Sequence, residues 1–330
     1  MRIDVIYATD ENYAMYTGIS IYSLYEHNTD ISDLRVHILD NYISEESKNS
    51  LQHIADVFNR SLYFYDAKAM FDELAQKIKM KNTQTITTYA SCFMAKLLPD
   101  DIKCALYVDG DSLFMGSVSE LAKMDMTNYY VAGSLDTCLP NVRLAIGLKK
   151  TDPYINAGFL YMNFEKIRNA DLDEEILTFI RDIIPTSLHN DQDVVNGVLG
   201  KKMKVLPAKY CVLTPLYEKK YEDVVEIFGL ENYYSKEEIF DAVENPVFVH
   251  FTPSATRRPW MKGCDHPKKP DWDYYKKFTD WKDVEDKEDK RSAKIKLLNW
   301  MFRHFSVRTY KFITGFYANG IKIKTRGITK

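Results

Sequence analysis

Cysteine is scarce in this chain and shows no pairing pattern. The five cysteines are odd in number and none stands in a C-x-x-C pair, so the sequence indicates neither a disulfide framework nor a zinc cluster. The first residues, Met1 to Tyr7, are strand-like and offer neither the apolar core of a signal peptide nor a stretch long enough to span a bilayer. Internal repeats and low-complexity segments are also lacking. These absences predict a globular protein of a reducing compartment, the cytoplasm.

Acidic residues are missing from the C-terminal end. Residues 290–330 hold eleven Lys or Arg and no Asp or Glu, so with a net charge of −3 overall, residues 1–289 carry −14. Aromatic residues interleave with these cations: Trp300, Phe302, Phe305, Tyr310, Phe312, Phe316 and Tyr317. Aromatic rings and cations together are typical of segments that bind an anionic membrane surface. We therefore expect residues 291–330 to bind peripherally at the inner face of the cell membrane. The alternative is a helical subdomain with a solvated basic face, and nucleic acid is not expected because the acidic body would repel it.

Strand-like and helical stretches alternate through the first half. A hydrophobic content of 45% over 330 residues is enough for a substantial core. Strands are expected at 3–8, 34–39, 62–65, a run ending at 109, and 130–135; helices are expected at 12–27, 44–59 with Ser44 as N-cap, 70–78 and 87–98. This alternation predicts an α/β fold whose mostly parallel sheet binds ligands beyond the carboxyl ends of its strands. Asp10, Asp109 and Asp136 lie at such ends.

The second half is less regular. Helices are expected over residues 163–182 and 191–199, the latter ended by Gly200, and a strand over residues 245–250. The polar stretches 262–272 and 280–290 are expected to connect the body of the protein to the basic tail.

The most informative motif is Asp109-Gly110-Asp111, which directly follows the apolar run from Cys104 to Val108. Two carboxylates one residue apart at the end of a buried strand can hold a divalent cation. Hard ions such as Mg²⁺ and Mn²⁺ prefer oxygen ligands and are commonly bound by one or two carboxylates together with substrate phosphates. The motif therefore predicts a metal-diphosphate site.

Four other segments are more polar than their apolar flanks require. In residues 8–13, Asp10 and Asn12 can hydrogen-bond a base or ribose, or simply cap a helix. In residues 154–163, Gly158 permits close backbone approach to a ligand, or forms a bulge. The segment 189–197 crowds Asp191, Gln192 and Asp193 at a helix start, where capping explains one carboxylate but not the whole set. The segment 249–260 offers a histidine that can complete a metal site and two arginines that match phosphate oxygens.

Together, these segments resemble, in order and spacing, the retaining glycosyltransferases of family 8, which include bacterial lipooligosaccharide galactosyltransferases and glycogenin. The resemblance implies a GT-A type, Rossmann-like catalytic domain over residues 1–262 and a helical, basic extension over residues 263–330. It also implies transfer of galactose or glucose from a UDP-sugar to a glycan, lipid-linked or protein-linked acceptor, with retention at the anomeric carbon.

The resemblance assigns roles residue by residue. Asp109, Asp111 and His250 would bind Mn²⁺, or Mg²⁺ in its place, with Gly110 between the two carboxylates. The remaining donor-site residues would be Ala8, Thr9, Asp10, Asn12 and Tyr13 near the uridine, Asn156, Ala157 and Gly158 near the sugar, and Arg258 on the diphosphate. Asp136, Asp191 and Gln192 would be catalytic. Because an amide is a poor nucleophile, we expect a front-face substitution in which the leaving diphosphate helps to deprotonate the acceptor and Gln192 stabilises the oxocarbenium-like sugar.

Two departures from the family pattern keep alternatives open. The chain has Tyr89-Ala90-Ser91 where the family usually has Tyr-Ala-Arg, and the loop after His250 is two residues longer and ends Arg258-Pro259-Trp260 rather than Lys-Pro-Trp. A nucleotide-sugar-binding protein without activity would be compatible with both changes. A metal-dependent phosphohydrolase of the haloacid dehalogenase type also uses an Asp-x-Asp motif, but on an early strand and usually followed by Thr or Val rather than Ser112.

Overall fold

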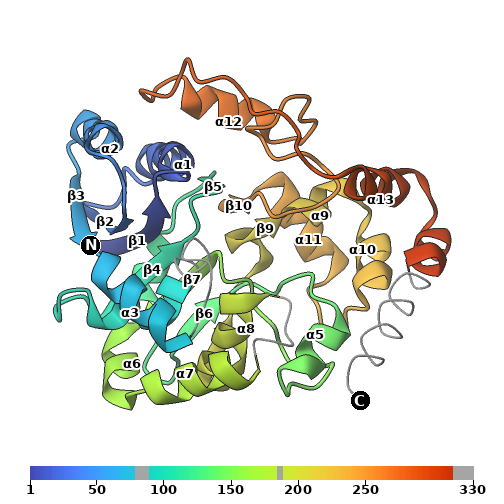
Figure 1. Cartoon of the computed structure of the whole chain (residues 1–330), viewed down its shortest axis with the longest axis horizontal. Coiled ribbons are helices and arrows are strands. Elements are labelled where there is room, and N and C mark those ends of the chain that lie inside the picture. Colours follow the sequence, from blue (N-terminus) through green and yellow to red (C-terminus); the bar gives the residue numbers. More distant parts are fainter. Residues whose placement is uncertain (79–88, 184–188, 315–330) are drawn as a thin grey trace.

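A seven-stranded sheet forms the centre of the molecule (Figure 1), a computed structural model that describes residues 1–78, 89–183 and 189–314. The strand order is β3-β2-β1-β4-β7-β6-β8. The strands are β1 (Arg2–Asp10), β2 (Asp33–Asn41), β3 (Ser61–Asp66), β4 (Cys104–Val108), β6 (Val131–Gly133), β7 (Phe159–Asn163) and β8 (Met203–Val205). All neighbours pair in parallel except β7, which is antiparallel to both β4 and β6. The mostly parallel α/β sheet predicted from the alternation is therefore confirmed.

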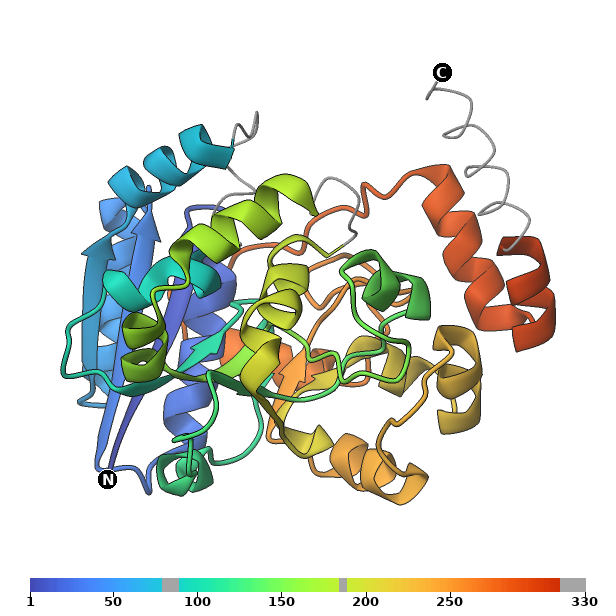
Figure 2. The ribbon, with the colours of Figure 1, turned by 90° about the horizontal axis from the view of Figure 1, so that it is seen from below.

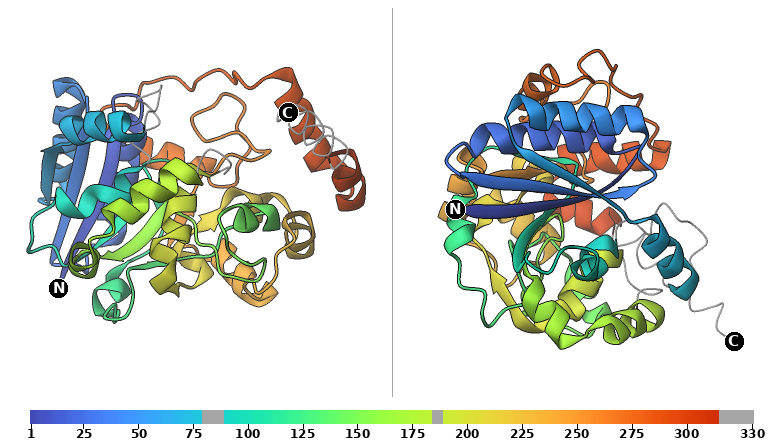
Figure 3. Two further views of the ribbon diagram at one scale, coloured as in Figure 1. Left: turned by 60° about the horizontal axis from the view of Figure 1, so that its bottom comes forward. Right: turned by 90° about the vertical axis from the view of Figure 1, so that its left-hand side faces the viewer.

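Helices cover both faces of this sheet (Figure 3) because the buried side chains of its strands alternate in direction. In β1, Val5 belongs to the core on one face and Ile6 to the core on the other. The first face is covered by α1 (Ala14–His27) and α2 (Glu45–Val57). The second is covered by α3 (Lys68–Ile78), α4 (Ala90–Phe93), α6 (Phe164–Ala170), α7 (Asp173–Asp182) and α8 (Asn190–Gly197). The sheet is thus the middle of three layers.

Local sequence signals account for most of the helix boundaries. Ser44 caps α2 as predicted, since its hydroxyl accepts from the Ser47 amide at 3.2 Å. The prediction of one helix over residues 163–182 is wrong: Asp171, at φ 45°, ends α6 in the left-handed region and separates it from α7. Gly200 does not end α8, because it lies inside a following 3-10 turn, Leu199–Lys202. Of the predicted helix 87–98, residues 87 and 88 lie outside the described residues, and α4 is followed by a 3-10 turn at Met94–Lys96.

A second, three-stranded sheet lies beside the carboxyl end of β4. Its order is β5-β10-β9, with β5 (Ser112–Phe114), β9 (Val212–Leu213) and β10 (Phe248–His250). The antiparallel pairing of β10 with β5 places His250 opposite Ser112, one residue beyond Asp111. Short helices complete this half of the molecule: α5 (Pro140–Ala145), α9 (Thr214–Glu218), α10 (Tyr221–Phe228) and α11 (Lys236–Glu244).

The chain beyond residue 262 packs on the body of the protein at two places. Helix α12 (Lys269–Lys276) lies on α1, and its Trp272 is fully buried, with its ring centre 5.2 Å from that of Trp260. Helix α13 (Ala293–His304) lies at the opposite end of the molecule (Figure 2), so the predicted helix in the basic tail is present. None of the helices in the described part of the chain combines the length and apolar character that crossing a bilayer requires.

Candidate active site

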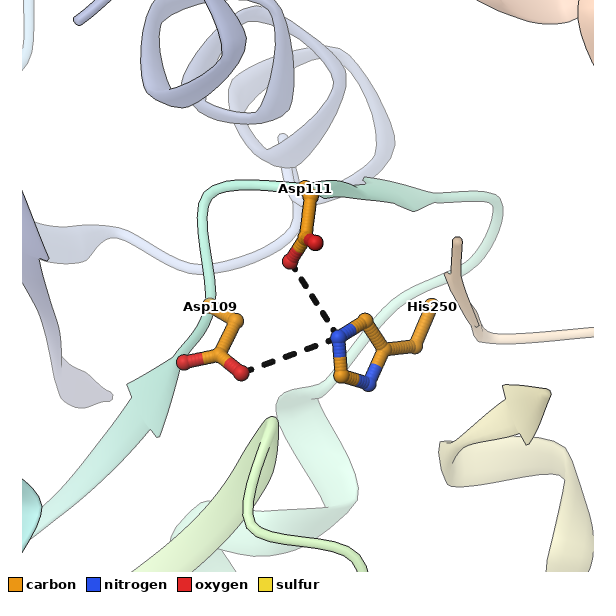
Figure 4. A group of neighbouring side chains, drawn as sticks. All are labelled: Asp109, Asp111 and His250. Carbon is orange, nitrogen blue, oxygen red and sulfur yellow. Dashed lines mark hydrogen bonds and ion pairs between the residues drawn. The ribbon is translucent and has the colours of Figure 1, made fainter. Parts of the chain in front are cut away.

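Three metal-ligand side chains meet beyond the carboxyl end of β4. Asp109 and Asp111 come from the turn that joins β4 to β5, and His250 comes from the end of β10 (Figure 4). One ligand atom from each residue can be chosen so that all three lie within 4.8 Å of one another. Asp111 and His250 are buried, whereas the side chain of Asp109 is 36% exposed. Two carboxylates and one imidazole make a donor set that fits a divalent cation such as Mn²⁺.

The orientation of His250 suits metal binding. Its Nε2 atom lies 3.2 Å from Asp111 Oδ1 and 3.6 Å from Asp109 Oδ2, while Nδ1 lies 2.9 Å from Asn156 Oδ1. That amide oxygen also accepts from the Gly158 amide, which identifies it as an acceptor. Nδ1 therefore donates its proton to Asn156, and the lone pair of a neutral imidazole is left on Nε2, facing both carboxylates. A metal-binding histidine is commonly fixed in this way by a hydrogen bond from its other nitrogen.

The three groups are electrostatically coupled. Burial raises the pKa of the Asp109 carboxyl to about 6, with His250 opposing the rise and Asp111 adding to it. Burial would also raise the pKa of Asp111, but His250 and Arg258 outweigh it and hold that pKa below its ordinary value. For His250, burial would lower the pKa, but Asp111 raises it well above the ordinary value. A protonated His250 would attract both carboxylates, and a cation bound by the three groups would replace that proton.

Glycine is required at two positions by close packing around this cluster. A Cβ atom on Gly158 would lie 2.3 Å from His250 Cε1 and 2.4 Å from Nδ1, and one on Gly110 would lie 2.4 Å from Thr17 Oγ1. The sequence left two interpretations of Gly158, a bulge or a close approach of the backbone to a ligand, and the structure adds a third. Gly158 makes room for the imidazole ring, and Gly110 lets the metal-site turn approach α1.

Asp136, Asn156 and Gln192 form a buried hydrogen-bonded network next to the metal cluster. Asp136 Oδ2 accepts from Gln192 Nε2 at 2.7 Å and from Asn156 Nδ2 at 2.9 Å. Gln192 Oε1 accepts from the Ala157 amide at 3.0 Å and from Asn156 Nδ2 at 3.1 Å. Every polar atom of the Gln192 amide group therefore has a protein partner, and the side chain is held in one orientation. The structure thus brings Asn156, predicted to lie near the sugar, together with Asp136 and Gln192, two of the residues predicted to be catalytic.

The two acidic neighbours of Gln192 have different surroundings. Asp193 is fully buried and accepts from the Tyr154 hydroxyl at 2.6 Å and from the His189 amide at 2.9 Å, so it holds the start of α8 in place. The carboxyl group of Asp191 has a pKa raised well above its ordinary value, first by burial and then by the charge of Asp109. Asp191 therefore shares an electrostatic environment with the metal cluster.

Arg258 reaches the metal cluster from the loop after β10. Its Nη2 atom lies 3.3 Å from Asp111 Oδ2, and its guanidinium lies 5.4 Å from the centre of the Trp260 ring. Tyr13 is a neighbour of Arg258, whose charge opposes the rise that burial causes in the pKa of the Tyr13 hydroxyl. The altered loop thus still places a guanidinium beside the metal ligands. Ser91, which stands where the family has arginine, is buried and has its hydroxyl 3.8 Å from Cys92 Sγ.

The end of β1 presents backbone and side-chain groups on the Tyr13 side of the site. Asp10 Oδ1 accepts from the amides of Asn12 at 2.9 Å and Tyr13 at 3.2 Å, so this carboxylate caps the turn into α1. The Asn12 side chain is exposed and Ala8 is half-buried. Thr9 is buried, and its hydroxyl accepts from Thr17 at 3.1 Å inside the fold. Of this predicted group, Thr9 is fully inside the fold, and Ala8 packs against the core on the second face of the sheet.

Sequence patterns gave no sign of two residues that contact the cluster. The Tyr107 hydroxyl donates to Asp109 Oδ1 at 3.1 Å, and Cys211 Sγ lies 3.5 Å from Asn156 Oδ1. Tyr107 lies in β4, two residues before Asp109, so period-two alternation could have suggested that both side chains lie on one side. Cys211 directly precedes β9, and no local pattern identifies it.

A cavity of about 530 Å³ lies between the loop after β10 and helix α13. Arg258 and Arg291 contribute polar groups, and the lining is otherwise largely apolar, with Phe228, Met261, Ile295, Phe302 and Tyr310 among its residues. Arg258 lines the cavity and its guanidinium also contacts Asp111, so this one side chain links the cavity to the metal cluster. Two parts of the chain that are far apart in sequence therefore border one space.

Comparison with known protein families matches residues 4–264 to the model described as glycosyl transferase family 8. Among curated proteins, a lipopolysaccharide 1,2-glucosyltransferase of Escherichia coli strain K12 is 25% identical over 340 residues, which cover 96% of this chain and 88% of that protein. General stress protein A of Bacillus subtilis is 23% identical, over 85% of this chain and 95% of its own length. A putative glycosyltransferase of Haemophilus influenzae is 26% identical over 63% of this chain, and the match spans 62% of that protein, less than two thirds.

Solved structures show the same architecture. The galactosyltransferase LgtC, in complex with donor and acceptor sugar analogs, superposes with a TM-score of 0.70 at 20% identity, covering 83% of this chain and 95% of that chain. The apo structure of the bifunctional glycosyltransferase WbbM gives a TM-score of 0.69 at 18% identity, covering 85% of this chain and 50% of that chain. At such identities the likeness concerns the fold, which is the GT-A type expected from the sequence.

Proposed function

This chain belongs to glycosyl transferase family 8, and we propose that it is a retaining hexosyltransferase that uses a UDP-sugar and Mn²⁺. The observation that supports this most strongly is the approach of Asp109, Asp111 and His250 to within 4.8 Å, with His250 Nε2 facing both carboxylates. These three residues would hold Mn²⁺, or Mg²⁺ in its place. When bound, the ion would supply positive charge that offsets the negative charge developing on the departing UDP.

The protein side chains on the diphosphate side are pre-arranged for an anion. Arg258 is aimed at the metal cluster, and its planar guanidinium can pair with two phosphate oxygens at once. In the absence of a ligand it pairs with Asp111, a contact that a diphosphate would compete for. The uridine would lie toward Asp10, which ends β1, and Asn12, which is exposed in the following turn at the same edge of the sheet.

The sugar side provides orientation rather than a nucleophile. Gln192 is held by Asp136 and by the Ala157 amide, so its carbonyl dipole keeps one direction while positive charge develops at the anomeric carbon. Asp191 directly precedes Gln192, but burial and Asp109 raise the pKa of its carboxyl group and favour the neutral acid, which is a poor nucleophile. Both observations support front-face substitution, in which the leaving diphosphate assists deprotonation of the acceptor hydroxyl.

The acceptor would enter near Arg258. The largely apolar cavity between the loop after β10 and α13 is linked to the metal cluster by Arg258, and it suits a glycan ring face or a lipid-linked acceptor. Relatives are named lipopolysaccharide 1,2-glucosyltransferase and lipopolysaccharide 1,3-galactosyltransferase, which favours a lipid-linked glycan and UDP-glucose or UDP-galactose as donor. A protein acceptor would use the same donor chemistry.

The C-terminal extension would bring the enzyme to an anionic membrane surface on the cytoplasmic side. The exposed apolar side chains Leu297 and Trp300 of α13, together with Phe312, occur among Lys294, Lys296, Arg308 and Lys311. Such interleaving of rings and cations is typical of segments that bind a membrane interface.

The decisive assay measures UDP release from a panel of UDP-sugars with Mn²⁺, with Mg²⁺ and after metal removal by EDTA. The proposal predicts release from UDP-galactose or UDP-glucose that requires the added metal. Release of phosphate without nucleotide preference would instead indicate a phosphohydrolase. Tight UDP binding with no turnover on any donor and acceptor would indicate a non-catalytic nucleotide-sugar-binding protein.

A further inference from the structure

The loop that carries Arg258 is held in place from two sides. This loop, residues 251–258, is here called the clamp loop. On one side, Glu218 at the end of α9 accepts hydrogen bonds from the Ser254 hydroxyl and the Thr256 amide. On the other side, Arg291 Nη1 donates to the carbonyl oxygens of Ser254 and Ala255, each at 3.3 Å. The second set of contacts comes from the C-terminal extension, more than thirty residues later in the chain.

Asp289 connects the extension to the clamp loop. Its carboxylate accepts from Arg291 Nε at 3.0 Å and Nη2 at 3.1 Å, and from Arg257 Nε at 3.2 Å. The side chain of Asp289 is only 9% exposed, and the hydrogen bonds from Arg291 hold its pKa well below the ordinary value. One partly buried carboxylate thus orients two guanidinium groups, one within the clamp loop and one against its backbone.

These contacts lie one residue away from Arg258. Arg257 is tied to Asp289, while the next residue sends its side chain to Asp111 at 3.3 Å. A second link nearby reinforces the arrangement, because the backbone of Lys287 pairs with that of Trp260 at 2.7 Å. The backbone on both sides of Arg258 is therefore fixed by residues 287–291, and none of these residues contacts the metal cluster itself.

We propose that Asp289 is a positioning residue that acts through the clamp loop to hold Arg258 on the diphosphate. This inference rests on the proposed function, since it assumes that Arg258 contacts the donor. A loop two residues longer than the family pattern has more conformational freedom, and charge-assisted hydrogen bonds from the extension restrict it. The extension would consequently have two roles: it would hold Arg258 at the donor site, and it would bind a membrane surface.

One consequence concerns truncation. Deleting residues 291–330 would remove Arg291 and Arg303, the latter bonded to the Thr256 hydroxyl at 3.0 Å. Such a deletion would weaken both donor binding and membrane binding. Point substitutions are therefore needed to test the two roles of the extension separately.

The test uses Asp289→Asn in the full chain, with Asp286→Asn as the matched control. Asp286 lies in the same segment and pairs with Lys269 at 3.0 Å, away from the clamp loop. UDP affinity in the presence of Mn²⁺ is measured by calorimetry, and amide hydrogen exchange of residues 251–258 is measured without nucleotide. We expect Asp289→Asn to weaken UDP binding about tenfold, as loss of an outer-shell partner does, and to speed exchange in the clamp loop. Asp286→Asn should change neither.

A double-mutant cycle with Arg258→Ala distinguishes positioning from general destabilisation. If Asp289 acts through Arg258, then Asp289→Asn should weaken UDP binding by less than about twofold in the Arg258→Ala background. Arg291→Lys is a second variant, since lysine keeps the charge but cannot bond Asp289 and two carbonyls together; it should also weaken UDP binding.

Two results would overturn the positioning role: unchanged UDP affinity in Asp289→Asn when the wild type binds UDP, or an equal loss in both Arg258 backgrounds. Failure of the wild type to bind UDP at all would overturn the proposed function instead. In that case the hydrogen-exchange comparison would still show whether Asp289 holds the clamp loop, because it needs no nucleotide.

Discussion

Gly158→Ala is predicted to weaken Mn²⁺ binding without removing any metal ligand. The added Cβ would lie 2.3 Å and 2.4 Å from His250 Cε1 and Nδ1, whereas ordinary contacts begin near 3.4 Å, so the imidazole must recede by about 1 Å. Metal–ligand distances tolerate changes of only about 0.2 Å. The same movement stretches the hydrogen bond from Nδ1 to Asn156, which is 2.9 Å in this structure. We therefore expect Mn²⁺ affinity to fall by roughly 10–100-fold, and the overpacking to cost about 1–3 kcal/mol of folding free energy.

The assay is a Mn²⁺ titration followed by electron paramagnetic resonance, with urea unfolding to measure stability. Gly116→Ala is the matched control, because its added Cβ would meet Val247 at an ordinary 3.4 Å. The control should bind Mn²⁺ like the wild type. Equal Mn²⁺ affinity in Gly158→Ala and Gly116→Ala would refute the idea that Gly158 positions His250, and with it the geometry assigned to the metal site.

Three further predictions follow from the site and the extension. Gln192→Ala should reduce turnover by at least about tenfold while leaving UDP binding nearly intact, because the amide is assigned to the sugar rather than the diphosphate; loss of UDP binding in calorimetry would exclude that role. Mn²⁺ affinity should rise with pH between about pH 5 and pH 8, because the pKa of Asp109 is raised to about 6 and that of His250 well above its ordinary value, so both must lose protons on binding; a pH-independent titration would contradict this. Substituting serine for both Trp300 and Phe312, which are 51% and 67% exposed, should abolish sedimentation with anionic liposomes and leave UDP release unchanged; unchanged sedimentation would refute the membrane role.

The fold was predictable because its signals are local. Strands alternate with helices, and Asp10 and Asp109 each stand where a strand ends, so the edge that carries the site follows from the expected parallel sheet. The antiparallel direction of β7 was not predictable, since pairing direction depends on chain connections rather than on side-chain pattern. The break at Asp171 was also missed, because a non-glycine residue in the left-handed region leaves little trace in the sequence.

The site was predictable as a set of residues but not as a geometry. Resemblance to a family identified Asp109, Asp111 and His250, and the structure brings them together through two different sheets. The contact between Gly158 and His250 joins residues far apart in the sequence, so the glycine alone allowed several interpretations. The contacts between Asp289 and the clamp loop could not be predicted either, because they also join residues far apart in the sequence. In the sequence, the residues around Asp289 look like a polar connector.

The central claim is that Asp109, Asp111 and His250 hold the cation of a nucleotide-sugar site. A crystal structure with Mn²⁺ and UDP, with anomalous scattering recorded at the manganese edge, tests it most directly. We predict one anomalous peak within coordination distance of both carboxylates, of His250 Nε2 and of the diphosphate, with Arg258 on the phosphate oxygens. UDP bound at this edge of the sheet with no manganese between the three side chains, or manganese bound elsewhere, would contradict the claim.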